Sequence, residues 1–256
     1  ISIRHLRGAL SAGAQEMART MGQIVAISAA YQGFFDVDNR LLKEFGKENA
    51  QQSGSLSVPI DAPLKWDAEH PHLYTIVSSI EEEGQTTLQK KERIGFREVQ
   101  VDGNKLLVNG KPVKLRGACR HDVHPTLGRM TTDEYDKTDV LLSKEANMNF
   151  IRTSHYPPSE AFLRYCDEYG IYVEDETAVC FVNTFRREGY NQVDSTQNDP
   201  EYTHWYLSQV EEMVNIHRNH PSVIMWSIGN ESRYGSNFQK CYDWIKANET
   251  TRPVIF

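Results

Sequence analysis

The chain has 256 residues, of which 39% are hydrophobic and 25% charged, and it carries a net charge of −7. These proportions are typical of a globular protein that is long enough for two domains. The acidic balance argues against a nucleic-acid partner, because no surplus of positive charge is available to neutralise phosphates. Apolar runs stop well short of the roughly 20 residues that a membrane-spanning helix needs, so we expect no membrane partner either.

Residues 1–95 have the pattern of a β domain. Residues 1–30 are ambiguous between helix and strand, but short apolar or alternating segments separated by turn residues follow them. The expected strands are 33–37, 41–45, 55–60, 73–77 and 88–94, with turns at 38–40 and 81–84. Several short strands with turns at such intervals predict an antiparallel β-sandwich.

The pattern changes at residue 96, where strand and helix signals begin to alternate. A hairpin is expected over 106–113, because Asn109-Gly110 is a strong turn signal. The expected strands that follow are 114–119, 149–153, 171–174, 223–227 and 253–256, and the expected helices are 131–147, 158–169, 199–219 and 236–248. Strands that alternate with helices in this way predict a parallel sheet with right-handed crossovers.

Three local signals mark where the helices begin or end. Thr131 and Glu134 have the spacing of a capping box at a helix start. Gly170 is expected to stop the second helix. Asp199 followed by Pro200 predicts the start of the third.

A closed (β/α)8 barrel takes eight strand–helix units and roughly 250 residues. Residues 96–256 therefore predict the N-terminal half of a TIM barrel, which stops near the fifth strand. An open half exposes strand edges that need to be paired. We therefore expect the chain to be a fragment of a longer protein whose remainder covers these edges, or a homo-oligomer in which a second copy covers them.

The first four expected parallel strands all end in side chains that are fit for chemistry. These strand ends are Arg120-His121-Asp122 with His124, Arg152-Thr153-Ser154-His155-Tyr156, Glu174-Asp175-Glu176, and Asn230-Glu231. In a barrel they converge on one face, which predicts a hydrolytic site. Glu231, backed by Trp226 and next to Asn230, suits a general acid, because apolar walls raise the pKa of a carboxyl and the amide can hold a substrate hydroxyl. The alternative is an Asn-Glu turn that only caps the next helix.

Other chemistries have weaker support in the sequence. His121 and His124 have three-residue spacing and Glu176 could complete a metal site, but zinc needs three or four ligands in fixed geometry. The sequence has neither a G-x-S-x-G nucleophile elbow nor a glycine-rich phosphate loop. The four cysteines have no C-x-x-C pair and are expected to be free thiols. His217 and His220, at a helix end, are expected to cap carbonyls.

Four stretches of the sequence are specific enough to compare with known families. They are 66–74 with 94–97, 109–125, 152–157 and 219–232. Together they resemble glycoside hydrolase family 2, and the Arg120-His121 and Asn230-Glu231 stretches are most similar to those of bacterial β-galactosidases. The resemblance implies an immunoglobulin-like β-sandwich over 1–95, followed by the N-terminal half of a TIM barrel over 96–256.

The resemblance also implies a retaining exo-β-glycosidase in which Glu231 is the acid/base. Glu231 would protonate the glycosidic oxygen and then deprotonate the water that releases the sugar. Asn230 would hydrogen-bond the 2-hydroxyl of the sugar, and two imidazoles would line the donor-sugar pocket. The expected substrate-binding residues are Asn230, His121, His155, Asp122 and Trp226.

Two features depart from the family pattern. The nucleophile of the family is a glutamate near the end of the seventh strand, so it lies outside this chain, and we expect the chain alone to be inactive. The positions that bind magnesium in the magnesium-dependent members correspond here to Cys180 and Val182. No magnesium or other cofactor is therefore expected.

The expected substrate is a terminal β-D-galactoside of an oligosaccharide or glycan. The stretch 175–179 is closer to the metal-free β-glucuronidases of the same family, which makes a β-glucuronide the alternative. A third interpretation is a carbohydrate-binding or interaction fragment without catalysis.

Overall fold

The computed structural model describes residues 29–35, 41–48, 60–82, 85–183 and 195–256. The expected turn at 38–40 and nearly all of the expected strand 55–60 lie outside these residues, as does most of the ambiguous segment 1–30. The described residues fall into two compact units, one built on 73–94 and the strands paired with it, the other on 65–72 and 95–256. No helix among the described residues is both long and apolar enough to cross a membrane.

The first unit is an antiparallel sheet of two hairpins. Its strands are β1 (Ala29–Phe35), β2 (Leu41–Glu48), β3 (Tyr74–Glu82) and β4 (Gln85–Ile94), in the order β2-β1-β3-β4. β1 pairs with β2 and β3 with β4, both antiparallel, in agreement with the expected antiparallel strands. β3 continues through Glu82, so the turn expected at 81–84 begins later than predicted. The described residues of this unit hold one sheet, so the second layer of the expected sandwich is not among them.

A small sheet opens the second unit. It consists of β5 (Val99–Asp102), β6 (Lys105–Val108) and β7 (Lys111–Pro112). The predicted hairpin is confirmed between β6 and β7, where Val108 pairs with Lys111 across a two-residue turn. Asn109 and Gly110 both have left-handed backbones, with φ of 54° and 76°, as a type I′ turn requires.

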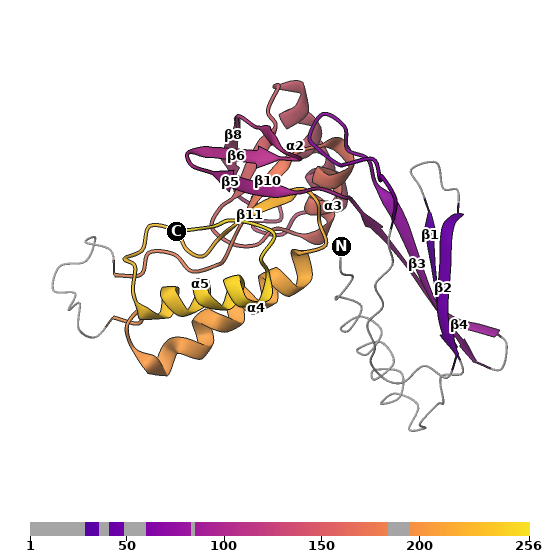
Figure 1. The fold of residues 1–256 in the computed structure, drawn as a ribbon. Coiled ribbons are helices and arrows are strands. Elements are labelled where there is room, and N and C mark those ends of the chain that lie inside the picture. The colour runs from indigo at the N-terminus through magenta and orange to yellow at the C-terminus, as the bar shows by residue number, and fades with distance from the viewer. Residues whose placement is uncertain (1–28, 36–40, 49–59, 83–84, 184–194) are drawn as a thin grey trace. The chain divides into compact units, whose positions relative to one another are not determined.

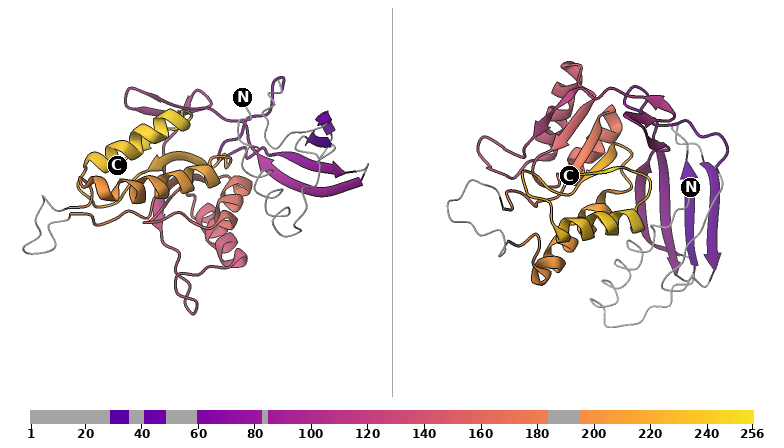
Figure 2. Two further views of the ribbon diagram at one scale, coloured as in Figure 1. Left: turned by 90° about the horizontal axis from the view of Figure 1, so that it is seen from below. Right: turned by 60° about the vertical axis from the view of Figure 1, so that its left-hand side comes forward.

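The rest of the second unit is a parallel sheet with helices between its strands (Figure 1). The strands are β8 (Gly117–Arg120), β9 (Phe150–Thr153), β10 (Tyr172–Glu176), β11 (Val223–Ser227) and β12 (Val254–Ile255), and the helices are α2 (Asp133–Glu145), α3 (Glu160–Tyr169), α4 (Thr203–His217) and α5 (Ser236–Asn248). All neighbouring strands run parallel in the order β12-β11-β10-β9-β8. α4 and α5 pack against each other (Figures 1 and 2). The predicted alternation of strand and helix is confirmed.

The helix boundaries follow the sequence signals with one shift. The N-cap of α2 is Thr132, whose Oγ1 accepts a hydrogen bond from the Tyr135 amide, and not Thr131 as the capping-box spacing predicted. Gly170 ends α3 with a left-handed φ of 77°, as predicted. Asp199 caps a short 3₁₀ turn that leads into α4.

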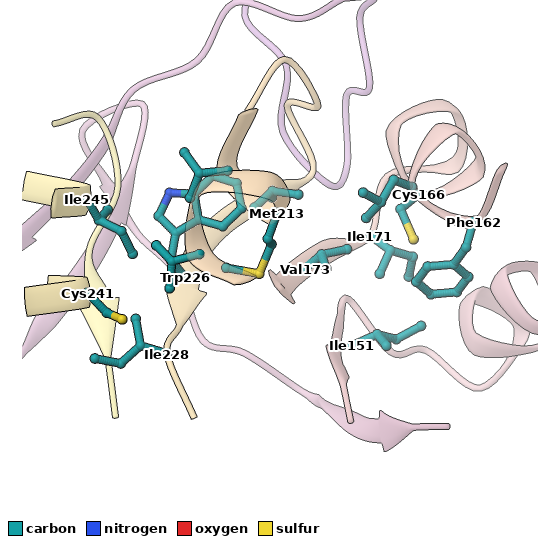
Figure 3. Packing of buried hydrophobic residues seen from close by; sticks show 14 of the residues in the cluster. Ile151, Phe162, Cys166, Ile171, Val173, Met213, Trp226, Ile228, Cys241 and Ile245 are labelled. Carbon is teal, nitrogen blue, oxygen red and sulfur yellow. The ribbon is translucent and has the colours of Figure 1, made fainter. Parts of the chain in front are cut away.

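The hydrophobic core lies between the parallel sheet and its helices (Figure 3). Val173 and Trp226 contribute from the sheet, while Met213 and Ile245 contribute from α4 and α5. Each of these side chains is at most 1% exposed. The middle strands β10 and β11 are buried throughout, whereas β8 at the edge of the sheet is largely exposed.

Replacing Phe162 with alanine tests this core. The Phe162 ring is fully buried, and the Arg120 guanidinium lies over it at 4.1 Å. Phe162→Ala should lower the free energy of unfolding by roughly 3 to 5 kcal/mol in a denaturant titration, because a cavity replaces the ring. Leu142→Ala on α2, where the side chain is 56% exposed, is the matched control and should cost less than about 1 kcal/mol. Equal losses from the two variants would contradict this description of the core.

Candidate active site

The carboxyl ends of β9, β10 and β11 are joined by one buried carboxylate, that of Glu176. Its Oε2 accepts hydrogen bonds from Arg152 Nε at 3.0 Å and from Ser227 Oγ at 2.7 Å, and Arg152 Nη2 also binds it. Its Oε1 lies 3.0 Å from His155 Nδ1. Glu176 is fully buried, so these contacts replace the water that would otherwise solvate its charge.

The same arginine orients the Asn230 side chain. Arg152 Nη2 donates to Asn230 Oδ1 at 2.8 Å, which fixes which end of the carboxamide faces Arg152. Asn230 is 6% exposed, and its Nδ2 has no hydrogen-bond partner among the residues that the structure describes. A buried amide donor without a partner is costly unless a ligand or water accepts its hydrogen. Asn230 therefore keeps one buried amide donor at this edge of the sheet for which the described residues supply no acceptor.

The predicted residues His121 and His155 lie together. Their ring centroids are 5.0 Å apart in an edge-to-face arrangement, and the Tyr156 ring lies 6.1 Å from that of His121. His155 is tied to Glu176, whereas His121 is exposed. The two imidazoles come from the ends of β8 and β9, and His155 joins them to the buried carboxylate.

Asp122 lies at this edge, but its carboxylate is bound by Arg120. Arg120 also pairs with Asp136 at 2.7 Å and with Asp139 at 2.7 Å, both on α2. Burial raises the pKa of Asp122, and the positive charge of Arg120 opposes this shift. Asp122 therefore holds its loop against the sheet through Arg120, and its amide is held by the Tyr156 hydroxyl at 3.0 Å.

Trp226 is a correction to the predicted set. Its side chain is fully buried and lies beside Met213 and Ile245 in the helix-covered core (Figure 3). The Arg252 guanidinium covers its ring at 5.2 Å. Alternation along β11 directs Trp226 to the helix side of the sheet. It supports the strand that leads to Asn230 and does not line the polar cluster.

Glu231 follows Asn230 directly and is exposed. Its backbone is left-handed, with φ of 38°, so the chain turns sharply at this residue. Burial raises the pKa of the neighbouring Cys180 thiol, and the negative charges of Glu176 and Glu231 raise it further. Both carboxylates are therefore close enough to the Cys180 thiol to raise its pKa, which places them at the same edge of the sheet.

Glu174 is the second buried carboxylate that faces Arg152, which it contacts at 3.0 Å. Burial raises the pKa of Glu174 from 4.5 to about 7, because the attraction of Arg152 is outweighed by desolvation and by repulsion from Glu176. Its side chain is about one-tenth exposed. Glu174 thus titrates in the neutral range, unlike an ordinary surface glutamate.

Cys180 and Val182 stand at the positions that the resemblance assigns to magnesium ligands. Mg²⁺ prefers oxygen ligands in octahedral geometry, whereas the chain offers the Cys180 thiol and the aliphatic Val182. The zinc alternative is also unsupported, because the His124 ring packs on Tyr135 at 4.8 Å and its Nδ1 accepts the Leu127 amide hydrogen at 3.2 Å. No group of three His, Cys, Asp or Glu side chains suited to a metal occurs within the described ranges.

The prediction for His217 and His220 is wrong. His217 Nδ1 lies 2.6 Å from Asp175 Oδ2, and His220 Nδ1 lies 2.5 Å from Asp167 Oδ2. Both imidazoles therefore pair with buried carboxylates and do not cap helix carbonyls. The sequence carried no signal for these pairs, since their members are 42 and 53 residues apart.

Sequence reasoning placed Arg152 and Glu176 at strand ends but gave neither a structural role. Their position after consecutive buried strands was the available signal. Tyr156 and Ser227 were likewise visible only as polar residues near strand ends, and the structure adds their contacts to Asp122 and Glu176.

The family model described as "Glycosyl hydrolases family 2, TIM barrel domain" matches residues 99–256. The chain belongs to glycosyl hydrolase family 2. A second model of the family, described as "Glycosyl hydrolases family 2", matches residues 28–97. The two matches and the similar structures support an immunoglobulin-like domain followed by a TIM-barrel domain, as predicted.

Curated relatives within glycosyl hydrolase family 2 include bacterial β-galactosidases, as the resemblance predicted. The β-galactosidase of Pectobacterium atrosepticum is 38% identical over 219 residues, which are 83% of this chain and 20% of the relative. That of Vibrio vulnificus is 40% identical over 195 residues, or 76% of this chain and 18% of the relative. The chain thus spans about a fifth of the length of these relatives.

Similar solved structures of the family include β-glucuronidases. The Parabacteroides merdae enzyme has a TM-score of 0.77 and 26% sequence identity, covering 91% of this chain and 29% of its own. β-Glucuronidase 3 of Bacteroides uniformis also has a TM-score of 0.77 and 26% identity, covering 89% of this chain and 29% of its own.

Removing Arg152 should leave the buried Glu176 charge without compensation. Arg152→Met is expected to lower the free energy of unfolding by roughly 3 to 5 kcal/mol, measured by denaturant titration. Adding Glu176→Gln to Arg152→Met should recover part of the lost free energy of unfolding, because the buried carboxylate without a cationic partner is then removed. The exposed pair of Arg164 and Asp133, 2.8 Å apart, is the control, and Arg164→Met should cost less than about 1 kcal/mol. A double variant as unstable as the sum of its single changes would contradict the pairing.

Glu174 should make stability depend on pH in the neutral range. Its folded-state pKa of about 7 lies above the unfolded value of 4.5, so the folded protein holds this proton more tightly. Its contribution to stability is therefore largest below about pH 4.5 and is lost as the pH rises toward about 7. Between about pH 5 and about pH 8, the unfolding free energy of the wild type should fall by about 2 to 3 kcal/mol relative to Glu174→Gln. A difference that stays constant with pH would refute the shift.

Proposed function

We propose that the chain provides the acid/base half of the active site of a retaining exo-β-glycosidase. The observation that carries the proposal is the buried Asn230 amide, whose Oδ1 is held by Arg152 and whose Nδ2 is left to donate into the pocket beside Glu231. In a retaining glycosidase, hydrogen bonds to the sugar 2-hydroxyl strengthen in the transition state. The orientation of Asn230 suits such a bond, with Nδ2 donating to the hydroxyl oxygen.

Glu231 is the proposed acid/base. It protonates the glycosidic oxygen as the bond to the anomeric carbon breaks, and in the second step it takes a proton from the water that releases the sugar. His121 and His155 form hydrogen bonds with hydroxyls of the donor sugar through their ring nitrogens. His155 is held in place for this by Glu176 at 3.0 Å.

The nucleophile is proposed to lie outside this chain, in the part of the protein that completes the barrel. Glu176 cannot take this role while fully buried and bound by Arg152, His155 and Ser227. Glu174 is also mostly buried and paired with Arg152. A retaining mechanism needs its second carboxyl about 5 to 5.5 Å from the first, so the chain alone is expected to be inactive.

A terminal β-D-galactoside is the proposed substrate. The support is the 38–40% identity to relatives named β-galactosidase. Arg120 and Arg152 are both bound by carboxylates of the chain, so neither is available for the carboxylate of a glucuronide. The fold similarity to β-glucuronidases, at 26% identity, keeps a β-glucuronide as the second candidate. Turnover of galactoside and glucuronide chromogens by the complete enzyme separates the two.

Glu231→Gln tests the acid/base role in the complete enzyme. We expect a loss of about 10²- to 10⁴-fold in kcat/KM on an alkyl glycoside, whose leaving group needs protonation. The loss in the first step should be far smaller on an activated aryl glycoside, whose leaving group needs little acid help. Glu145→Gln, at the exposed end of α2, is the control and should leave both rates unchanged.

Equal losses on the two glycosides would refute the acid role of Glu231. Sugar binding without any hydrolysis, unchanged by Glu231→Gln, would support the rival function of a non-catalytic carbohydrate-binding module. Hydrolysis of the alkyl glycoside by the wild type excludes that rival.

A further inference from the structure

Phe181 presents a large apolar side chain at the polar edge of the sheet. Its side chain is 46% exposed, although the residue lies in the segment that follows β10. The backbone of Phe181 is left-handed, with φ of 60°, a conformation that bulky residues rarely adopt. Such strained residues persist only where the surrounding structure holds them, and they gather at functional sites.

Hydrogen bonds hold the Phe181 segment alongside that of Glu231. Cys180 and Asn230 form a parallel bridge, in which the Asn230 amide donates to the Val179 carbonyl at 3.0 Å and the Phe181 amide donates to the Asn230 carbonyl at 3.1 Å. The two segments run in the same direction, so the residues that follow the bridge, Phe181 and Glu231, are lateral neighbours.

Beyond this pair the ladder continues, since the Val182 amide donates to Ser232 Oγ at 3.0 Å and the Arg233 amide donates to the Val182 carbonyl at 3.0 Å. Hydrogen bonds on both sides of Phe181 therefore fix its backbone beside the proposed acid/base.

On its other side, Phe181 contacts a proposed donor-sugar residue. Its ring lies 6.1 Å from that of His155 in a T-shaped arrangement, with an interplanar angle of 73°. Phe181 thus neighbours both His155, which follows β9, and Glu231, which follows β11. If Glu231 acts at the glycosidic oxygen, that oxygen comes close to Phe181.

Burial separates the floor of this site from its mouth. Glu176 is fully buried and Asn230 is 6% exposed, whereas Phe181 is 46% exposed and Glu231 also faces solvent. An exo-acting enzyme encloses the terminal sugar at the closed end of its pocket and leaves the departing group toward the opening. An exposed aromatic ring next to the proposed acid is therefore a candidate surface for the departing group.

We propose that Phe181 is a specificity-determining residue that stacks on the leaving group of the substrate, favouring aryl aglycones or the apolar face of a second sugar. The inference rests on the proposed function, because it needs Glu231 to act at the glycosidic oxygen. The phenyl ring offers an apolar, π-rich surface that can pack on another ring or on C–H groups. Packing there also keeps water from the oxygen that Glu231 protonates.

The test compares two β-galactosides on the complete enzyme, one phenyl and one fluoroalkyl, chosen so that their leaving groups have similar acidity. Phe181→Ala should lower kcat/KM for the phenyl glycoside by roughly three- to tenfold more than for the fluoroalkyl glycoside. Phe181→Leu keeps apolar volume without the ring and should show the same preference, whereas Phe181→Tyr should behave like the wild type. Trp205→Ala, on α4 with a side chain 61% exposed, is the control for loss of an exposed aromatic residue.

Equal losses on the two glycosides, or none on either, would overturn the assignment of Phe181. If Phe181→Ala weakens inhibition by free galactose but leaves kcat/KM for both glycosides unchanged, the ring packs against the donor sugar. That result would equally overturn the assignment. If Phe181→Ala fails to fold, the same comparison of kcat/KM for the two glycosides is made with Phe181→Leu. Failure of the proposed function has a different signature, because the wild type would then hydrolyse neither glycoside.

Discussion

The ion pair between Arg152 and Glu176 holds the carboxyl ends of the strands in one arrangement. Glu176 has no exposed surface, and a carboxylate in such a place is stable only when cations and hydrogen-bond donors surround it. Arg152 supplies the charge from β9, and Ser227 supplies a hydroxyl from β11. Since β10 lies between those two strands, one side chain fixes three strand ends. The orientation of the Asn230 amide follows from the same arginine.

β10 buries charge on both of its faces. Glu174 and Glu176 face the arginine, while Asp175 points to the other face and pairs with His217 at the end of α4. Every residue of this strand is buried, as expected for a parallel sheet covered on both sides. Charges in such a strand require specific partners, so they fix the docking of α4 more narrowly than apolar contacts would.

The polar residues at the strand ends have two kinds of role. Some hold the loops in place, and others are proposed to bind the substrate. Asp122 and Glu176 are bound by arginines of the chain, and their contacts keep the loops in place. The Nδ2 of Asn230 and the exposed His121 point to a role in binding, and the proposed roles of Glu231 and Phe181 belong to the same opening. The charge-compensated buried residues thus lie beside exposed ones, an arrangement that is consistent with the proposed glycosidase site.

The sequence by itself determined the alternation of strands and helices and the turn at Asn109-Gly110, because apolar periodicity and left-handed turn residues are local properties. It also determined the family, through stretches such as Asn230-Glu231, and it placed polar residues at the strand ends. Which of these are buried as supports and which are exposed was decided by the tertiary structure. Trp226 turned toward the helices, and His217 paired with Asp175 from 42 residues away. Phe181 came to lie next to Glu231. Such pairings depend on which strands and helices become neighbours, and contacts between residues far apart in the chain are not encoded by any local pattern.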